Sequence, residues 1–420
     1  MDHFTAIAGV LHAEDVTISD IAATVGTPFY CYSSAMMLDR YNAYVGALQG
    51  LSADVYYAVK ANSNLAVIQT LATAGAGADV VSIGEIKRSI AAGVPADKVL
   101  FAGVGKTREE LAEALRLGIR QINLESDAEL RALSEVAVSI GIEARAGLRV
   151  NPDVDARTHV KITTGRKENK FGVDLDRAPE IFGLAASLPG VSMPSLSVHI
   201  GSQLTDISPY REAYARLREI TLELRSAGHV INHLDLGGGL GIAYGAEIPP
   251  DLDAYAAIIS DHVGDLDCAL SVEPGRFLVG DSGILVTSVV YVKQGGEKRF
   301  VIADAAMNDL IRPTLYEAYH EIVVVSDPNA EPIPGVCDLV GPICESGDYI
   351  AQDRALPTVA EGDLLAVRSA GAYGAVMSST YNSRPLIPEV MVKGAEFAIV
   401  RRRQTVEEAM ALEQVPDWFR

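Results

Sequence analysis

The sequence is poor in cysteine and tryptophan, and these shortages exclude several classes of protein. Its 420 residues include four cysteines and one tryptophan. The cysteines form no C-x-x-C pair, so neither a zinc ribbon nor a dithiol redox motif is supported, and no metal site is expected. Few and scattered cysteines suit a reducing compartment, so we expect a cytoplasmic protein.

Basic residues are also scarce. Lys and Arg total 35 against 55 Asp and Glu, which gives a formal net charge of −20. Because nucleic-acid-binding proteins usually carry a basic surface, we expect no nucleic-acid partner. No apolar run reaches the roughly 18 residues of a membrane-spanning helix, and the N-terminal residues lack the basic cluster of a signal peptide, so we expect no membrane partner.

Short apolar runs alternate with helical patterns over the first two thirds of the chain. Helix-capping signals mark Thr107–Leu117, Ser126–Val138 and Pro209–Ala227. Eight strands are predicted, at Val55–Val59, Asp79–Ser82, Val99–Ala102, Gln121–Leu124, Ala146–Val150, Leu196–Ile200, His233–Leu236 and Leu270–Val272. Eight strand–helix units favour an α/β fold of the (β/α)8 TIM-like barrel type over an open, doubly wound sheet.

The pattern changes near Gly280, where short alternating runs separated by Gly, Pro and Asp predict an all-β domain. The first 30 residues also look strand-like. We therefore expect a (β/α)8 barrel that binds a cofactor over residues 31–282. Residues 1–30 plus 283–420 are expected to form a C-terminal β-sandwich-like or barrel-like domain, with a surface helix at Thr405–Leu412.

A long connection, Asn151 to Lys170, interrupts the barrel pattern. It is rich in basic residues and lacks apolar periodicity. Because loops of this length inside a compact domain are often functional, a lid is one interpretation, and a solvated loop is the alternative.

Two candidate functional groups follow predicted strands. Lys60 ends the first strand in Y-A-V-K-A-N, where burial would lower the pKa of its amine and favour Schiff-base chemistry; a surface lysine is the alternative. The glycine run Gly237–Gly241 follows the seventh strand. Loops after strands seven and eight of such barrels often bind phosphate, although a glycine run alone is weak support.

Two further groups end neighbouring strands. His199 could stack on a planar cofactor or be a buried structural histidine. Glu273 could keep a ring nitrogen protonated or form a structural ion pair with Arg149. Since the carboxyl ends of barrel strands meet at one face, the amine, ring, phosphate cradle and carboxylate together predict pyridoxal 5′-phosphate as the cofactor.

Over nearly its whole length the chain resembles the diaminopimelate decarboxylases, within the alanine-racemase-like group of pyridoxal-phosphate enzymes. The motifs of the resemblance are Y-A-V-K-A-N with Lys60, K-F-G with Phe171, H-I-G-S-Q with His199, L-G-G-G-L-G, E-P-G-R with Glu273, R-P-T-L-Y at Arg312–Tyr316, C-E-S-G-D from Cys344 and A-Y-G with Tyr373. A small departure is Ile83 in V-S-I-G-E, where relatives often carry Gly.

The resemblance implies a role for each of these residues. Lys60 would carry the cofactor, His199 would stack on its ring, and Cys344 would be the proton donor. The remaining cofactor contacts would come from Ser202, Gly238, Gly239, Glu273, Gly275, Arg276 and Tyr373. The substrate would be bound by Arg276, Arg312, Tyr316, Glu345 and Tyr373.

The implied activity is decarboxylation of meso-2,6-diaminopimelate at its D-centre to L-lysine and carbon dioxide, the last step of lysine biosynthesis. Arg312 suits a distal carboxylate and Glu345 a distal ammonium group. A decarboxylase of ornithine, arginine or carboxynorspermidine is the alternative, and it predicts no dependence on Arg312. A racemase fits Glu273 less well, and a non-catalytic regulator typically loses Lys60 or Cys344. The resemblance also implies a homodimer with composite active sites, in which Cys344 comes from the second subunit.

Overall fold

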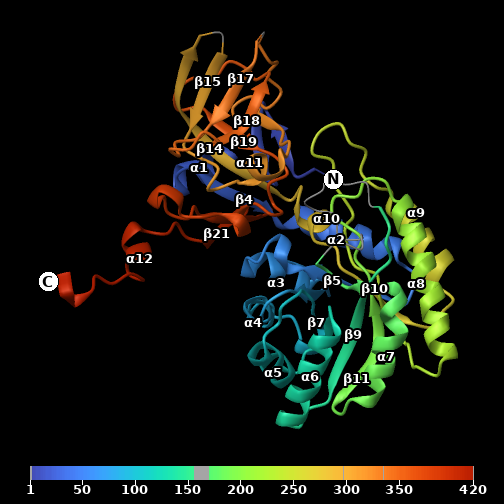
Figure 1. The fold of residues 1–420 in the computed structure, drawn as a ribbon. Helices are drawn as coiled ribbons and strands as arrows, with labels where there is room; N and C mark the ends of the chain where they lie inside the picture. The colour runs from blue at the N-terminus through green and yellow to red at the C-terminus, as the bar shows by residue number, and fades with distance from the viewer. Residues whose placement is uncertain (1, 156–169, 297, 334, 420) are drawn as a thin grey trace. The chain divides into compact units, whose positions relative to one another are not determined.

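The computed structural model describes residues 2–155, 170–296, 298–333 and 335–419. The chain divides into two compact units, which we call the barrel unit (residues 38–243 and 247–278) and the β unit (residues 1–37, 244–246 and 279–420). Figure 1 shows the chain as a ribbon. Residues 156–169, most of the connection interpreted as a lid, lie outside the described residues.

Within the described residues, the barrel unit is a closed barrel of eight parallel strands, which confirms the predicted TIM-like architecture. The strands, in spatial order, are β5 (Ala53–Ala58), β6 (Gly77–Val80), β7 (Val99–Phe101), β8 (Gln121–Leu124), β9 (Ala144–Asn151), β11 (Val191–Ser197), β12 (His233–Asp235) and β13 (Ala269–Val272). The barrel closes because β13 pairs with β5, and a short strand β10 (Val173–Asp174) pairs with β9.

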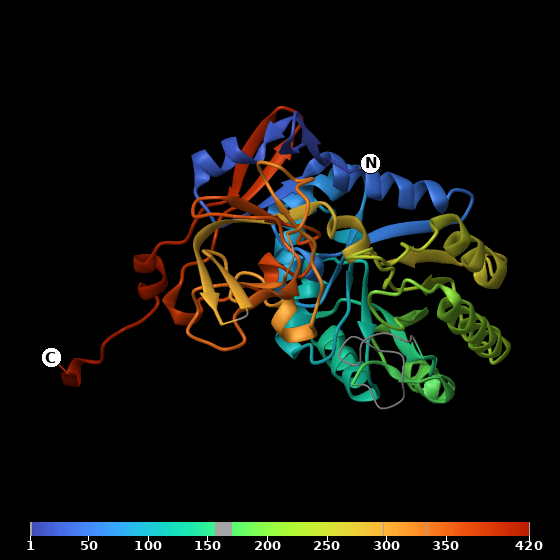
Figure 2. The same cartoon turned by 90° about the horizontal axis from the view of Figure 1, so that it is seen from above.

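Helices surround these strands, as Figures 1 and 2 show. They are α2 (Ser34–Ala47), which begins in the β unit, α3 (Leu65–Thr73), α4 (Ile83–Ala91), α5 (Arg108–Leu117), α6 (Asp127–Ile140), α7 (Ala178–Ser187), α8 (Ser208–Ser226), α9 (Leu252–Val263) and α10 (Arg276–Val279). Most residues of the barrel strands are buried, as expected for strands that are covered on both sides.

The predicted helix caps are present, with one difference. At α5, Thr107 and Glu110 form a reciprocal capping box. At α6 the Ser126 hydroxyl accepts the N–H of Glu129, but the Glu129 carboxylate does not return to Ser126. It accepts the N–H of Glu125 at 2.7 Å and pairs with Lys106 at 2.7 Å. The S-D-A-E pattern therefore gives half of a capping box, because a buried lysine competes for the glutamate.

The β unit is built mainly on one mixed sheet, ordered β18-β17-β15-β14-β4-β20-β21, with β19 and β16 joined through β14. Its strands are β4 (Phe29–Ser33), β14 (Gly283–Gly295), β15 (Lys298–Ala303), β16 (Ile322–Val324), β17 (Cys337–Val340), β18 (Tyr349–Arg354), β19 (Leu364–Val367), β20 (Glu389–Lys393) and β21 (Glu396–Arg401). Two short helices, α11 (Arg312–Tyr316) and α12 (Val406–Met410), complete it. Thr405 and Glu408 form a capping box at α12, inside the helix predicted there.

The N-terminal residues belong to the β unit but are not all strand. A three-stranded sheet of β1 (Phe4–Ile7), β2 (Val10–Ala13) and β3 (Val16–Thr17) is followed by a helix, α1 (Ile18–Val25). The sequence analysis missed this helix, whose start is fixed by the Thr17 side chain accepting the N–H of Asp20. The strand β4 then lies between β14 and β20.

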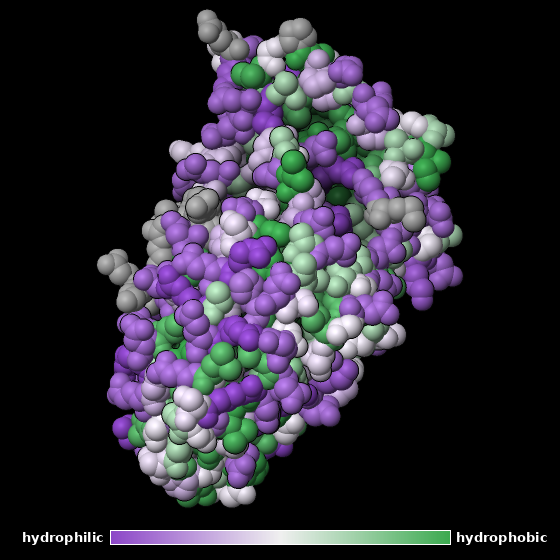
Figure 3. Space-filling view, turned by 90° about the vertical axis from the view of Figure 1, so that its right-hand side faces the viewer, coloured by the Kyte–Doolittle hydropathy of each residue, from purple (hydrophilic) through white to green (hydrophobic). Residues whose placement is uncertain are grey.

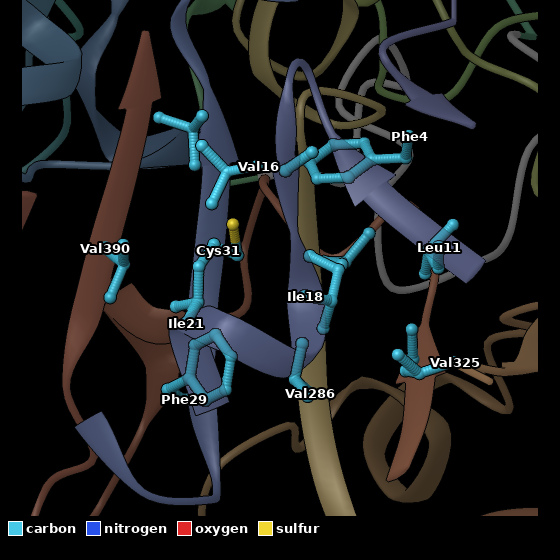
Figure 4. Packing of buried hydrophobic residues seen from close by; sticks show 14 of the residues in the cluster. Phe4, Leu11, Val16, Ile18, Ile21, Phe29, Cys31, Val286, Val325 and Val390 are labelled. Atoms are coloured by element: carbon cyan, nitrogen blue, oxygen red, sulfur yellow. The ribbon is translucent and has the colours of Figure 1, made fainter. Parts of the chain in front are cut away.

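Apolar side chains of this segment build one core of the β unit, shown in Figure 4. Phe4, Leu11 and Ile18 pack there with Phe29 of β4 and Val286 of β14. Each is at most 2% exposed, and burying such a side chain contributes about 1.5–3 kcal/mol. The first residues of the chain are therefore integral to the unit formed by its last third.

On the face drawn in Figure 3, hydrophilic side chains predominate and apolar ones are scattered among them. None of the helices in the described part of the chain combines the length and apolar character needed to cross a bilayer.

Candidate active site

Three of the predicted site residues line one cavity of the barrel unit. Lys60, His199 and Glu273 surround a volume of about 370 Å³ together with Arg149 and Phe171. Lys60, His199 and Glu273 each follow the carboxyl end of a barrel strand. The closed parallel sheet therefore brings these three residues together from distant parts of the sequence. The size falls in the range of small-molecule binding sites.

The amine of Lys60 is oriented by an acid that the sequence analysis did not single out. β5 ends at Ala58, and Lys60 lies in a 3₁₀ turn just beyond it. Its Nζ is 3.1 Å from Oδ2 of Asp79, a fully buried residue of β6. The Lys60 side chain is 35% exposed, so the amine is anchored and still accessible from the cavity.

His199 presents a neutral ring to the cavity. The N–H of Gly238 donates to His199 Nδ1 at 3.2 Å, which leaves the ring proton on Nε2. Burial lowers the pKa of the imidazole well below its ordinary value, and the cations of Lys60 and Arg149 lower it further. A neutral flat ring of this kind can stack on a planar ligand without adding positive charge.

Glu273 carries a buried carboxyl that is only partly satisfied. Its Oε1 has no hydrogen-bond partner among the described residues. Burial raises the pKa of this carboxyl well above its ordinary value, and the neighbouring Asp235 and Asp79 raise it further. A buried polar atom without a partner is costly, so a ligand atom that meets it gains strongly.

The alternative interpretation of Glu273 as an ion-pair partner of Arg149 is wrong. Arg149 pairs with Oε1 of Glu125 at 3.1 Å, and its guanidinium lies 4.8 Å from the centroid of the Phe171 ring. Glu125 ends up beside Arg149 because β8 and β9 are neighbours in the barrel. Glu273 is therefore left to the cavity.

The glycine loop after β12 is packed so closely that side chains are excluded. A Cβ atom would lie 2.2 Å from the Val198 oxygen at Gly237, 2.0 Å from the Glu273 oxygen at Gly238 and 2.3 Å from the Gly201 oxygen at Gly239. The loop is thus held against the segments that carry His199 and Glu273, with its backbone close to the cavity.

The predicted phosphate-binding residues meet nearby. Arg276 begins α10, and its Nη2 is 3.4 Å from Oγ of Ser202. Gly275 packs against β5 and the turn after it, since a Cβ there would lie 3.1 Å from the Cβ atoms of Ala58 and Ala61. A guanidinium, a hydroxyl and glycine backbone in one place make a suitable site for a phosphate group.

Apart from Arg276, which lies in the barrel unit, the predicted substrate-binding residues lie in the β unit, where Arg312 is held in one orientation. It is 5% exposed, and its Nη1 is 2.9 Å from His320 Nε2. The other ring nitrogen of His320 donates to the carbonyl of Arg368 at 2.8 Å, so Nε2 is left to accept from Arg312. The guanidinium also lies 4.4 Å from the centroid of the Tyr244 ring.

The C-E-S-G-D segment lies next to the helix that carries Arg312. Thr314, in α11, donates through its hydroxyl to the Gly347 carbonyl at 2.6 Å. Asp348 accepts the N–H groups of Met307 and Ile343, each at 2.7 Å, which fixes the start of the segment. The structure thus places Tyr316, at the end of α11, and the Cys344 segment in one region of the β unit.

Cys344, Glu345 and Tyr373 are accessible in the single chain. Cys344 and Glu345 are exposed, and the Cys344 N–H donates to Oδ1 of Asn382 at 2.8 Å. Tyr381 donates to Oε2 of Glu345 at 3.5 Å. Tyr373 is partly buried and has φ 55°, a left-handed backbone that is uncommon outside glycine and is frequent at ligand sites.

Several polar residues of the barrel interior were missed by the sequence analysis. They are Asp79, Asn123, Glu125, Ser197 and Asp235, all buried at or near strand ends. Their signal was available, since a charged or amide side chain inside an apolar strand is uncommon.

Comparison with known proteins gives consistent matches. The family model described as pyridoxal-dependent decarboxylase, pyridoxal binding domain, matches residues 35–280. The diaminopimelate decarboxylase of Zymomonas mobilis is 46% identical over 421 residues, covering 99% of this chain and 99% of that protein. That of Pseudomonas aeruginosa is 49% identical over 415 residues, also at 99% coverage of both.

Solved structures agree over the full length. The crystal structure of diaminopimelate decarboxylase from Helicobacter pylori complexed with L-lysine has a TM-score of 0.90 and 41% identity, covering 94% of this chain and 98% of that chain. The enzyme of the same name from M. jannaschii has a TM-score of 0.93 and 35% identity, covering 99% of this chain and 98% of that chain.

Proposed function

The chain belongs to the pyridoxal-dependent diaminopimelate decarboxylases, and we propose that it removes the carboxylate from the D-centre of meso-2,6-diaminopimelate to give L-lysine and carbon dioxide. The observation that carries this proposal is the convergence of Lys60, His199 and Glu273 on one cavity. An amine, a neutral flat ring and a buried carboxyl are the groups that such a reaction requires around its cofactor.

The residues of the cavity fit pyridoxal 5′-phosphate. Lys60 offers the amine for a covalent link to the cofactor, and Oε1 of Glu273 is a buried atom in need of a partner, which a ring nitrogen can supply. Arg276 and Ser202 offer donors to a phosphate group. When bound, this cofactor would supply an electron sink for the electron pair that stays on the substrate carbon when carbon dioxide leaves.

The side chains of the chain itself then bind, orient and move protons. Asp79 holds the Lys60 amine at 3.1 Å, and Gly238 fixes the tautomer of His199 so that the ring face stays neutral. We propose that the Cys344 thiol donates a proton to the carbon that has lost its carboxylate and regains one from solvent. The Cys344 thiol is exposed, which supports such a transfer.

Substrate selection is assigned to the β unit. We propose that the guanidinium of Arg312 binds the distal carboxylate and that Glu345 binds the distal ammonium group, so that the L-centre is held while the D-centre reacts. Tyr316, Arg276 and Tyr373 complete the substrate contacts. The fixed orientation of Arg312 against His320 supports this role, since an oriented guanidinium pairs with a carboxylate through two hydrogen bonds.

We further propose that the protein forms a homodimer with composite active sites and that it acts in the cytoplasm. The exposure of Cys344 and Glu345 in the single chain supports this, because a proton donor needs a covered site to work efficiently. Four free thiols among the described residues suit a reducing compartment.

Product analysis of the purified holoenzyme tests the activity. Incubated separately with the three stereoisomers of diaminopimelate, with ornithine and with arginine, it should release lysine from the meso isomer alone. A Lys60→Ala chain prepared in the same way should release none. Equal or faster turnover of ornithine or arginine would overturn the assignment and favour a polyamine-type decarboxylase.

A further inference from the structure

Lys106 is a buried lysine directly behind one wall of the cavity. It follows β7 in the loop that leads to α5, and Gly103 and Val104 of this loop line the cavity. The Lys106 side chain is 2% exposed. Lysine is almost never buried unless its ammonium group is paired, so this position requires specific partners.

Three acceptors surround the Lys106 ammonium group. Its Nζ donates to the carbonyl of Gly103, to the carbonyl of Asn123 and to Oε1 of Glu129, each at 2.7 Å. An ammonium group has three donors, so these contacts use all of them. Since Asn123 belongs to β8 and Glu129 to α6, the ammonium group ties the cavity-lining loop to the next strand and helix of the barrel.

The loop needs such an anchor because its backbone is permissive. Gly103 and Gly105 have φ 94° and 82°, a region that other residues rarely adopt. A Cβ at Gly103 would lie 3.3 Å from the Cβ of Val81, which also lines the cavity. The carbonyl that accepts from Lys106 thus belongs to a residue packed into the cavity wall, and a displacement of this carbonyl would move the wall.

The same network reaches a second part of the cavity wall. The other carboxylate oxygen of Glu129 accepts the N–H of Glu125 at 2.7 Å, and the Glu125 carboxylate pairs with Arg149 at 3.1 Å. Arg149 lines the cavity together with Phe171. The loop and the arginine are therefore positioned relative to one another through two buried acids.

We infer that Lys106 is a positioning residue for the proposed reaction: its ammonium group holds the Gly103–Val104 wall in the conformation that receives the cofactor. The inference rests on the proposed function for the identity of the bound group. A wall that is already ordered loses less conformational freedom when a ligand binds, so Lys106 raises the affinity for the cofactor by acting through Gly103.

A purely structural role for Lys106 predicts a different outcome. Lys106→Met leaves the Glu129 carboxylate, 9% exposed, without its counter-charge, so this variant should lose stability under either interpretation. Adding Glu129→Gln removes the unpaired charge, and the Gln oxygen can still accept the N–H of Glu125. The double variant should therefore recover much of the stability, but it still lacks the donor that held the Gly103 carbonyl.

The experiment measures the dissociation constant of pyridoxal 5′-phosphate by equilibrium dialysis of each holoenzyme, and urea unfolding measures stability separately. Partners that orient the groups lining a metal site typically contribute about 10- to 100-fold to affinity, and we expect a loss of that order in both Lys106→Met and the double variant. Lys87→Met is the matched control. Lys87 pairs with Glu113 on the surface, with side chains 59% and 41% exposed, so its replacement should leave the affinity unchanged.

An unaltered dissociation constant in the double variant would overturn the inference and leave Lys106 a purely structural residue. If Lys106→Met does not fold, the double variant alone decides. Lysine release by the unaltered chain is measured separately. A chain that binds the cofactor and yields no lysine would reject the proposed function, whereas weaker cofactor binding by the double variant would still establish the role of Lys106.

Discussion

Arg149 pairs with Glu125 across 3.1 Å, and this pair ties the K-F-G motif to the barrel. The second oxygen of Glu125 accepts the N–H of Gly172 at 2.6 Å, and the guanidinium lies 4.8 Å from the Phe171 ring centroid. Gly172 has φ 68°, and a Cβ there would lie 3.1 Å from the Arg149 oxygen, so only glycine fits. One acid therefore orients a cavity-lining arginine and the backbone that follows the long connection.

Glu125→Gln should destabilise the barrel unit by about 3–5 kcal/mol, because it leaves the guanidinium of Arg149 nearly buried without a counter-charge. The Arg149 and Glu125 side chains are 11% and 4% exposed. Urea unfolding of the cofactor-free protein, followed by far-ultraviolet circular dichroism, measures the change. Fluorescence would not serve, since the single tryptophan, Trp418, is 81% exposed.

Glu135→Gln is the matched control for that substitution. Glu135 pairs with Arg108 on the surface, with side chains 64% and 53% exposed, and such pairs contribute about 0–1 kcal/mol. Equal losses of stability in the two variants would contradict the importance assigned to the buried pair.

The barrel could be predicted from the sequence because its strands are buried on both faces. Such strands appear as continuous apolar runs, and Val99–Phe101 lies within the strand predicted at Val99–Ala102. The mixed β sheet was less accessible to prediction. The parallel pairing of β15 with β17, and of β4 with β20, depends on contacts between distant segments that no local pattern encodes.

The candidate active site, too, could be predicted only in part. Lys60, His199 and Glu273 stand in recognisable motifs at strand ends, so their convergence followed from the barrel itself. The hydrogen-bond and ion-pair partners of the cavity residues could not be predicted from the strand pattern. Asp79 reaches Lys60 from the neighbouring strand β6, and Arg149 pairs with Glu125 and not with Glu273 because β8 and β9 are neighbours in the barrel.

His233 should make the protein sensitive to acid. Burial lowers the pKa of its imidazole to about 3, helped by the cations of Arg120 and Arg145, and hydroxyls of Ser195 and Ser271 contact both ring nitrogens. The unfolded chain has an ordinary histidine pKa of about 6.5. The folded state therefore binds fewer protons below about pH 6.5, and stability falls as the pH falls from there towards about 3.

This loss amounts to about 1.4 kcal/mol per pH unit, or about 3 kcal/mol between pH 6.5 and 4. His233→Gln should be less stable than the unaltered chain near neutrality, because packing is lost, but its stability should decline less steeply over that interval. Urea unfolding midpoints of both proteins at a series of pH values measure the difference in their stability. Groups that titrate equally in the two proteins do not contribute to this difference. Parallel declines for the two proteins would show that His233 does not titrate on unfolding in this range.

Arg312→Lys should reduce kcat/KM for meso-diaminopimelate by about 10- to 100-fold. Replacing a guanidinium that pairs with the distal carboxylate loses one charge-assisted hydrogen bond and its orientation, a cost of about 1.5–3 kcal/mol. Arg354→Lys is the matched control, because Arg354 donates to the carbonyl of His320, the same residue whose ring contacts Arg312. Unchanged efficiency in Arg312→Lys would remove the distal carboxylate from the recognition scheme and favour the ornithine-type alternative.

Mixing two inactive variants tests whether the active sites are composite. Lys60→Ala and Cys344→Ala should each lack lysine-forming activity, because one loses the cofactor-linking amine and the other the proposed proton donor. If each site takes Lys60 from one subunit and Cys344 from its partner, half of the randomly reassociated dimers are mixed. Each mixed dimer then contains one site with both residues intact, so about a quarter of the original activity should return.

The mixture must first be dissociated and reassociated, and sedimentation velocity checks that dimers have formed. If each site were built from a single chain, no mixed dimer would contain both residues in one site, and the mixture would remain inactive.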